Sequence, residues 1–361
     1  MKRIAIICVI LCTPLLINAQ TQIPTLDDLD HEIAMSSQYD KQYEDVIRSV
    51  KKQLHAAKTL KARCELSDKL FNLYTSYSVD SAIVYAMEKQ KIAKAMGNQS
   101  KVNDAKLNLA YLLIRGGELK EASDIINSIP RSEINQDLSF YYFSTRKTLY
   151  RTLADAALIP SQRKMYKQME KLCNDSVVDN NQSPDIWSRA EQLVNRQQYE
   201  QAKKILLDAY HHLKPGDRQT AFVSISLADI YGREKNVEAQ KQYLIAAAIS
   251  DIRNSVKEYL ALQQLAMILF EEGDTKRAYA YMDHAMNDAV FCNARQRTIA
   301  MADVWPAIEK SHERETKSRT LKLTAALVLI SLLSVFLLVM IIYTRRRVVE
   351  LRAIRARLSN T

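Results

Sequence analysis

Small residues recur along the chain at a spacing typical of paired helices. Ala190, Ala202 and Ala209 are matched 76 residues later by a second alanine triplet, and a related set lies midway between the two. The four sets are Ala190, Ala202 and Ala209; Ala228, Gln240 and Ala247; Ala266, Ala278 and Ala285; and, upstream, Ala110, Ala122 and Ile129. Small side chains are needed where two helices approach closely. The spacing therefore predicts four helix pairs, which begin near residues 103, 183, 221 and 259.

Other positions in each pair carry the residue types that such packing requires. Large residues occupy a common position of the first helix, Leu113, Leu193, Tyr231 and Leu269, and of the second helix, Ile126, Leu206, Leu244 and Met282. Gly117 and Gly273 stand where the chain must turn between helices. This is the pattern of the tetratricopeptide repeat, so the predicted fold class is all-α, a tetratricopeptide-like helical-repeat solenoid.

Further helices are predicted outside the four repeats. One pair is expected over about 138–153 and 161–173, and another around Leu70, Leu73 and Tyr74, with Asp80–Ala82 capping its second helix. Leu26–Thr59 is interpreted as two capping helices with an apolar stripe, formed by Tyr39, Tyr43, Val46, Val50 and Leu54. The polar segment Asn174–Ser183 is predicted to be a loop. The expected domains are capping helices at 20–60, a first stack at 61–180 and a second stack at 183–312.

Both ends of the chain have the character of membrane-directed segments. Residues 1–19 combine Lys2 and Arg3 with an apolar run and a small residue, Ala19, which predicts a secretory signal peptide cleaved after Ala19. Residues 323–343 contain no charge over 21 positions. A helix of this length is about 31 Å long and matches the hydrocarbon core of a bilayer.

The residues after the predicted transmembrane helix give its orientation. Arg345, Arg346 and Arg347 follow it directly, and such residues stay on the cytoplasmic side. We therefore expect a single-pass inner-membrane protein with a periplasmic body and a short basic cytoplasmic helix over 344–361. An apolar stripe on that helix, Val348, Leu351, Ile354 and Leu358, resembles the start of a coiled coil and suggests dimerisation.

Composition and charge support the same picture. The chain has 361 residues with only 6 Gly and 7 Pro, which argues against β-sandwiches, barrels and glycine-rich phosphate loops. Its formal net charge of +10 is concentrated at the two ends, and the body is nearly neutral. The charge therefore bears on membrane orientation, and we expect no direct contact with nucleic acid. Three cysteines, Cys64, Cys173 and Cys292, are scattered singly in the mature chain and are expected to be buried hydrophobic residues.

No pattern in the sequence predicts catalysis, a metal or a cofactor. His31–Glu32 lacks the second histidine of a zinc protease motif, and the adjacent His211 and His212 must point to different sides of a helix. Asp27, Asp28 and Asp30 lack the glycine and the closing glutamate of a calcium loop, and are better interpreted as an acidic helix start. The chain is therefore not expected to be an enzyme.

A concave face lined by the first helices is the predicted binding surface. Its candidate residues are Tyr111, Trp187, Glu191, Asp229, Gln263, Met267 and Phe270. Mixed aromatic and polar side chains on one face suit a protein, a peptide or a small polar ligand. The alternative is that Trp187 and Phe270 simply pack between repeats.

Several segments together resemble a known family. They are the predicted signal peptide ending in Ala19–Gln20, Leu29–Asp30, Gln38–Tyr39, Lys51–Leu54, Tyr77–Ala82, the repeats and the late membrane helix. The chain resembles Bacteroidetes membrane-spanning regulators of the starch-utilisation type from about residue 20 onward. The resemblance implies a periplasmic repeat region that senses a signal and a cytoplasmic helix that leads into a DNA-binding domain.

The sequence departs from that family after the membrane helix. Thr344–Thr361 comprises 18 residues, into which a DNA-binding domain does not fit. The chain is expected to be either a truncated member or a protein that works through a partner. Two functions follow: the sensory and protein-interaction part of a transmembrane transcriptional regulator, or a single-pass envelope scaffold that assembles partners without signalling.

Overall fold

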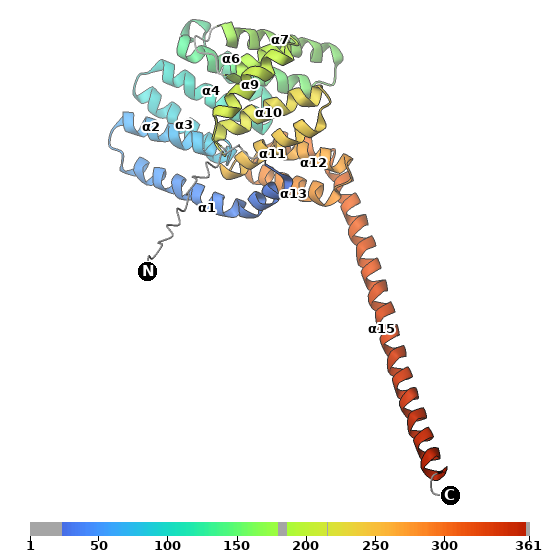
Figure 1. Ribbon diagram of the computed structural model, residues 1–361. Helices are drawn as coiled ribbons and strands as arrows, with labels where there is room; N and C mark the ends of the chain where they lie inside the picture. Colours follow the sequence, from blue (N-terminus) through green and yellow to red (C-terminus); the bar gives the residue numbers. More distant parts are fainter. Residues whose placement is uncertain (1–23, 180–185, 215, 359–361) are drawn as a thin grey trace, which may run out of the picture. The chain divides into compact units, whose positions relative to one another are not determined.

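The computed structural model describes residues 24–179, 186–214 and 216–358, and these residues form helices and turns with no strand (Figure 1). The predicted signal peptide over residues 1–19 lies outside them. Most of the helices follow one another as pairs: α2(Leu60–Tyr74) and α3(Val79–Ala95), α4(Gln99–Gly116) and α5(Leu119–Asn127), α6(Gln136–Ala156) and α7(Pro160–Asp179), α8(Ile186–Asn195) and α9(Tyr199–His212), α10(Arg218–Arg233) and α11(Val237–Arg253), α12(Ala261–Glu271) and α13(Thr275–Cys292). The long α1(Leu26–Ala56) precedes them, and α14(Arg295–Ala302) and α15(Trp305–Leu358) follow.

The chain divides into two compact units. The first runs to Leu265 and also contains Ala285–Thr298, and the second consists of Ala266–His284 with the residues from Ile299 onward. The first unit therefore holds α1 to α11 and the end of α13, and the second holds α15 and most of α13.

The predicted small positions lie where helices of a pair touch. Ala110 of α4, Ala122 of α5, Ala202 of α9 and Ala228 of α10 are fully buried. The same is true of Ala266 in α12 and of Ala278 and Ala285 in α13. The large residues Ile126, Leu206, Leu244 and Met282 are buried beside them. Gly117 and Gly273 adopt left-handed backbone angles, with φ of 83° and 88°, at the turns between helices. The all-helical repeat fold predicted from the sequence is confirmed.

The apolar core is distributed between neighbouring pairs. One cluster joins α1 to α2 and α3 through Ile47, Val50, Leu70, Phe71 and Ala82, and it also includes Cys292 of α13. Later clusters join α4 and α5 to α6, and α8 and α9 to α10. Cys64, Cys173 and Cys292 are buried and form no disulfide, as expected.

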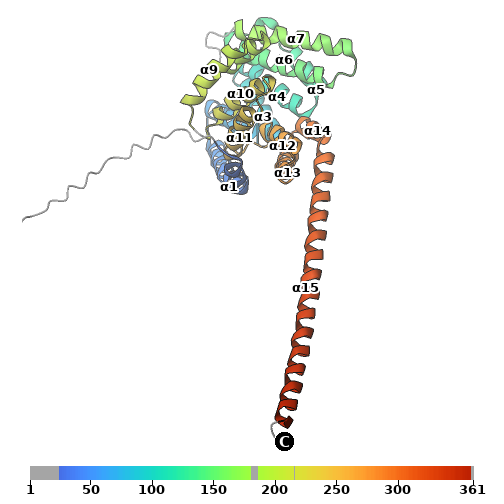
Figure 2. The same cartoon turned by 45° about the vertical axis from the view of Figure 1, so that its right-hand side comes forward.

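The prediction of two capping helices at the N-terminus is wrong, because α1 is one helix of 31 residues. It contains no Gly or Pro, and Thr25 starts it with a capping box to Asp28. The helix contacts α2 as well as α11, and Figure 2, which looks almost along α1, shows α11 beside it. Its buried stripe uses Ile47 instead of Val46, whose side chain is 47% exposed.

Two smaller boundaries also differ from the prediction. Asn174–Asp179, predicted to be loop, belongs to α7, and residues 180–185 lie outside the described residues. The cap of α3 is Ser78, whose hydroxyl accepts from the Ser81 amide, and not Asp80, which lies in the first turn. Ser78 provides the side-chain oxygen that an N-cap needs, and Asp80 adds negative charge at the positive end of the helix dipole.

Candidate functional site

The two ends of the first unit are held together by buried ion pairs. Lys257, which follows α11, is enclosed between the Asp40 carboxylate of α1 and the Asp288 carboxylate of α13, with N–O distances of 2.6 and 3.0 Å. Only 4% of the Lys257 side chain is exposed. Its backbone N–H donates to the Ser76 carbonyl at 2.7 Å. A buried ammonium group is stable only when it is paired in this way, so Lys257 fixes three distant segments to one another.

Further polar contacts join the same segments. Arg253 at the end of α11 pairs with Glu32 of α1 at 2.5 Å, and Asn293 donates to Asp80 of α3 at 2.9 Å. The hydrogen bond from Arg253 lowers the pKa of Glu32 below its usual value, against the opposing effect of burial. We call this set of contacts, formed by Glu32, Asp40, Ser76 and Asp80 with Arg253, Lys257, Asp288 and Asn293, the closing seam.

A buried arginine contacts residues that adjoin the closing seam in the sequence. Arg115 of α4 pairs with Glu258 at 2.5 Å, donates to the Thr75 carbonyl and lies over the Tyr111 ring at 5.6 Å. Asp251 of α11 lies near Glu258, and burial together with the Glu258 charge raises the pKa of Asp251 to about 7. The interior beside the closing seam therefore carries charge and contains a group that titrates near neutral pH.

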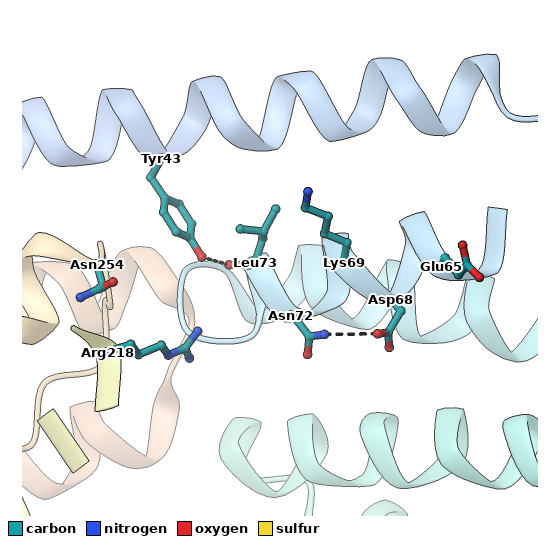
Figure 3. Close-up of a pocket in the computed structure, with 8 residues that line it drawn as sticks. All are labelled: Tyr43, Glu65, Asp68, Lys69, Asn72, Leu73, Arg218 and Asn254. Carbon is teal, nitrogen blue, oxygen red and sulfur yellow. Dashed lines mark hydrogen bonds between the residues drawn. The ribbon is translucent and has the colours of Figure 1, made fainter. Parts of the chain in front are cut away.

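A pocket of about 340 Å³, lined mostly by polar residues, opens next to the closing seam (Figure 3). Tyr43 of α1 and Glu65, Asp68, Lys69, Asn72 and Leu73 of α2 line one part of it, and Arg218 and Asn254 line the other. Positions 65, 68, 69 and 72 lie on one face of α2, because they are three or four residues apart. The pocket is thus built by the N-terminal helices together with the α10–α11 repeat.

Hydrogen bonds hold several of the pocket side chains in place. The Tyr43 hydroxyl donates to the Leu73 carbonyl at 2.6 Å, and Arg218 donates to the Ser76 hydroxyl at 2.9 Å. Asp68 pairs with Lys89 of α3 and accepts from Asn72 at 3.4 Å. Burial raises the pKa of Tyr43, so its hydroxyl stays protonated at neutral pH. The pocket therefore has fixed walls and carries both signs of charge.

A protein-family model, the SusR N-terminal TPR domain, matches residues 33–303 of the chain. The chain belongs to this family. No curated protein matches the chain. The matched range covers the pocket, the helix pairs and the closing seam except Glu32, and the family confirms the resemblance seen in the sequence. Such a tetratricopeptide fold is a protein-interaction fold.

The predicted groove residues of this SusR-type domain have separate partners. Glu191 of α8 pairs with Lys147 and Arg151 of α6. Although burial opposes it, the charge of these two cations lowers the pKa of Glu191. Asp229 pairs with Arg233 on its own helix at 2.9 Å, and Tyr111 lies beneath Arg115. Each of the three therefore already has a partner within the protein.

The remaining groove residues lie on α8 and α12. The side chain of Trp187 lies outside those that the structure describes. Gln263 is buried, and Met267 and Phe270 are partly buried. A binding face composed of the seven predicted residues stays a prediction.

Sequence reasoning missed the pocket. The charged face of α2 is visible in the sequence as Glu65, Asp68, Lys69 and Asn72. Nothing in the sequence connects this face to Arg218 and Asn254, which follow about 150 and about 185 residues later. Only the closure of the solenoid brings them together.

The second unit contains one helix that is long and apolar enough to cross a membrane. The candidate span lies within Trp305–Arg352 of α15, has a mean hydropathy of 3.1, and none of it is buried within the protein. The uncharged stretch 323–343 lies inside it, and the helix continues without a break through Arg345, Arg346 and Arg347. One apolar helix of this kind suggests a membrane span.

Proposed function

We propose that this SusR-type chain is the periplasmic sensor part of a transmembrane transcriptional regulator, anchored in the inner membrane by α15 with its C-terminus in the cytoplasm. The observation that carries the proposal is the continuity of α15, which runs for 54 residues from Trp305 to Leu358. One helix thus includes a segment in contact with a repeat helix, the candidate span and the basic segment beyond it. The predicted signal peptide and the three arginines support this orientation.

The start of α15 packs on the repeat helix α13 within the second unit. Tyr279 stacks on Trp305 and on His312, with ring centroids 5.3 and 4.1 Å apart. Thr275 donates to the Glu315 carboxylate at 3.2 Å. Positions 305, 312 and 315 share one side of a helix, so a rotation or shift of α13 is passed to α15 as a rigid body.

The far end of α15 offers a surface for pairing. Val348 and Leu351 are 47% and 63% exposed, and they are three residues apart on one side of the helix. Exposed apolar residues at this spacing support association with a second copy or with a partner helix in the cytoplasm. A protein or peptide, or a small polar ligand, would supply the signal on the periplasmic side.

The experiment is to insert residues between Lys317 and Ser318. Both are exposed, and they lie after the α13 contacts and before the uncharged stretch 323–343. Two added alanines turn everything downstream by about 200°, whereas seven alanines return it to within about 20° of its original direction. If orientation of α15 carries the signal, the two-residue insertion should change the transcript profile of the source cells, and the seven-residue insertion should preserve it.

Both variants must reach the membrane at the level of the unmodified protein, which is the control for folding and export. The alternative function, an envelope scaffold, predicts a different outcome. A scaffold should tolerate both insertions as well as deletion of residues 344–361, with no change in transcripts. That result would overturn the sensor proposal.

A further inference from the structure

Lysines gather at one edge of the first unit, where α1 and α3 end and α2 and α4 begin. Arg63 of α2 pairs with Glu88 of α3 at 2.8 Å. The Lys101 ammonium group of α4 lies 3.9 Å from the Cys64 sulfur of α2. Three residues join α1 to α2, and three join α3 to α4, so all four helix ends share this edge. We call the exposed lysines there the cationic edge: Lys52, Lys58, Lys61, Lys91, Lys94 and Lys101.

The positive charge of this edge is not balanced within the protein. Residues 51–65 and 88–104 contain nine Lys and Arg against three Asp and Glu, although the body as a whole is nearly neutral. Among the described residues, no lysine of the cationic edge forms an ion pair. Glu65 and Glu133 add two carboxylates nearby, and Glu133 accepts from Asn103 at 2.8 Å. An excess of positive charge therefore remains for an external partner.

Helix dipoles account for only part of this charge. Lys91 and Lys94 lie near the end of α3, where the negative end of the dipole attracts cations. Lys61 and Lys101 lie at the starts of α2 and α4, whose first turns contain no acid. The positive end of a helix dipole disfavours a cation at such positions. Stability of the helices therefore gives no reason for these two lysines, whereas binding of an anionic partner does.

The type of side chain indicates what kind of anion fits. Arginine and aromatic residues are enriched in protein–protein interfaces, and lysine is depleted. Residues 51–65 and 88–104 contain no aromatic residue, and their one arginine, Arg63, is already paired. Lysines are flexible point charges that require no fixed geometry of the anion. They suit a fluid surface of negative headgroups, to which each nearby lysine is attracted.

The chain itself brings the repeats near such a surface. Glu315, which accepts from Thr275 of α13, precedes the uncharged stretch 323–343 by eight residues. Eight helical residues correspond to about 12 Å. A domain tethered in this way meets the bilayer at a high effective concentration, so that individually weak contacts are sufficient.

We propose that the cationic edge docks on the headgroups of anionic phospholipids in the bilayer that α15 enters. This inference rests on the proposed function for the membrane anchor, and it does not depend on signalling. Docking relieves the mutual repulsion of the lysines. Because the side chains are exposed, salt screens the attraction strongly.

The test compares two vesicle compositions. The full chain is incorporated into vesicles of phosphatidylcholine alone, or of phosphatidylcholine and phosphatidylglycerol in equal parts. A membrane-impermeant reagent then acylates the lysines, and mass spectrometry gives the rate at each position. The lysines of the cationic edge should react about fivefold more slowly in the anionic vesicles, the factor that corresponds to the attraction of one lysine to an anionic surface. High salt should remove the difference.

Lysines elsewhere on the first unit are the internal control. Lys204 of α9 and Lys235, before α11, are exposed and lie outside the cationic edge. Both should react at the same rate in the two kinds of vesicle.

A charge-reversal variant tests the edge as a unit. Lys58→Glu, Lys61→Glu and Lys94→Glu together should abolish the slower reaction at the three remaining edge lysines. The matched control carries Lys204→Glu and Lys235→Glu, and it should keep the slower reaction. Since all of these side chains are exposed, both variants should unfold at the temperature of the unmodified chain.

Three results would overturn the inference. The first is an equal rate at the cationic edge in both kinds of vesicle. The second is an equal slowing of every lysine, which would indicate no specific surface. The third is that soluble poly-glutamate slows the edge lysines in neutral vesicles more than phosphatidylglycerol does, which would make the partner an acidic protein.

Failure of this inference can be distinguished from failure of the proposed function. If the chain does not stay with the vesicles after an alkaline wash, the anchor and the docking are both wrong. If it stays and the lipid has no effect, only the docking is lost, and the insertions in α15 still decide whether the chain signals.

Discussion

Asp251 shows how one residue can make the whole domain sensitive to pH. Burial and the Glu258 charge raise its pKa to about 7, while Arg218 and Arg297 act in the opposite direction. In an unfolded chain an aspartate has a pKa of about 3.9. Between about pH 3.9 and about pH 7 the Asp251 carboxyl is protonated in the folded protein but ionised in the unfolded chain. The free energy of unfolding is therefore highest at the acidic end of this range and falls as the pH rises toward 7.

We expect the chain to unfold more easily at pH 8 than at pH 5.5, by the order of 2 kcal/mol, since each pKa unit corresponds to about 1.4 kcal/mol. The Asp251→Asn variant should remove this difference. Glu32 and Glu191, whose pKa values are lowered, affect stability only at more acidic pH. Denaturant midpoints at the two pH values measure the effect, and an unchanged difference in Asp251→Asn would contradict the assignment.

The α10–α11 pair shows how an exception to the repeat pattern is tolerated. Gln240 of α11 occupies a position that is alanine in the other three repeats. The opposite residue on α10 is Gly232, and a Cβ atom there would lie only 2.7 Å from the Gln240 side-chain nitrogen. The glycine therefore provides the space that a small residue on α11 provides elsewhere.

This pairing predicts a non-additive change in stability. Alanine is favoured over glycine inside a helix by about 1 kcal/mol, so Gly232→Ala should stabilise the chain by this amount when Gln240→Ala is also present. In the unmodified background the gain should be smaller, because Gln240 must move away. A double-mutant cycle by urea unfolding measures the coupling, and equal effects in both backgrounds would rule the contact out.

At the level of elements, local patterns predicted most of the fold. Ala110, Ala202 and Ala228 indicate helix pairs because the requirement for a small side chain recurs within each repeat. The continuity of α1 has a local signal too, namely the lack of Gly and Pro. The closing seam has no such signal, since Arg253 and Glu32 are 221 residues apart, and the pocket depends on the same long-range contact.

For the whole molecule, the closing seam changes how stability is shared. In an open solenoid each repeat contacts only its neighbours, and a local defect stays local. In this chain α1 contacts α11 directly. A defect at either end of the repeat series should therefore weaken both ends together.

Amide hydrogen exchange measures whether the two ends of the repeat series lose stability together. Lys257→Ala leaves the Asp40 and Asp288 carboxylates without their common cation, a change that typically costs about 3–5 kcal/mol in a buried pair. We expect faster amide exchange in α1 and α2 as well as in α11, with α6 and α7 unaffected. Lys120→Ala, which removes an exposed pair with Asp124 on α5, is the control and should change none of these helices. Faster exchange near residue 257 alone would contradict the prediction.

The closing seam also has a consequence for biosynthesis. The partners of α1 at Arg253 and Lys257 are synthesised more than 200 residues after it. Until then the N-terminal helix cannot bury the part of its apolar face that meets α11, and contacts of such long sequence separation form slowly. A nascent or shortened chain that ends before α11 therefore exposes this face, and we expect it to depend on chaperones or to aggregate.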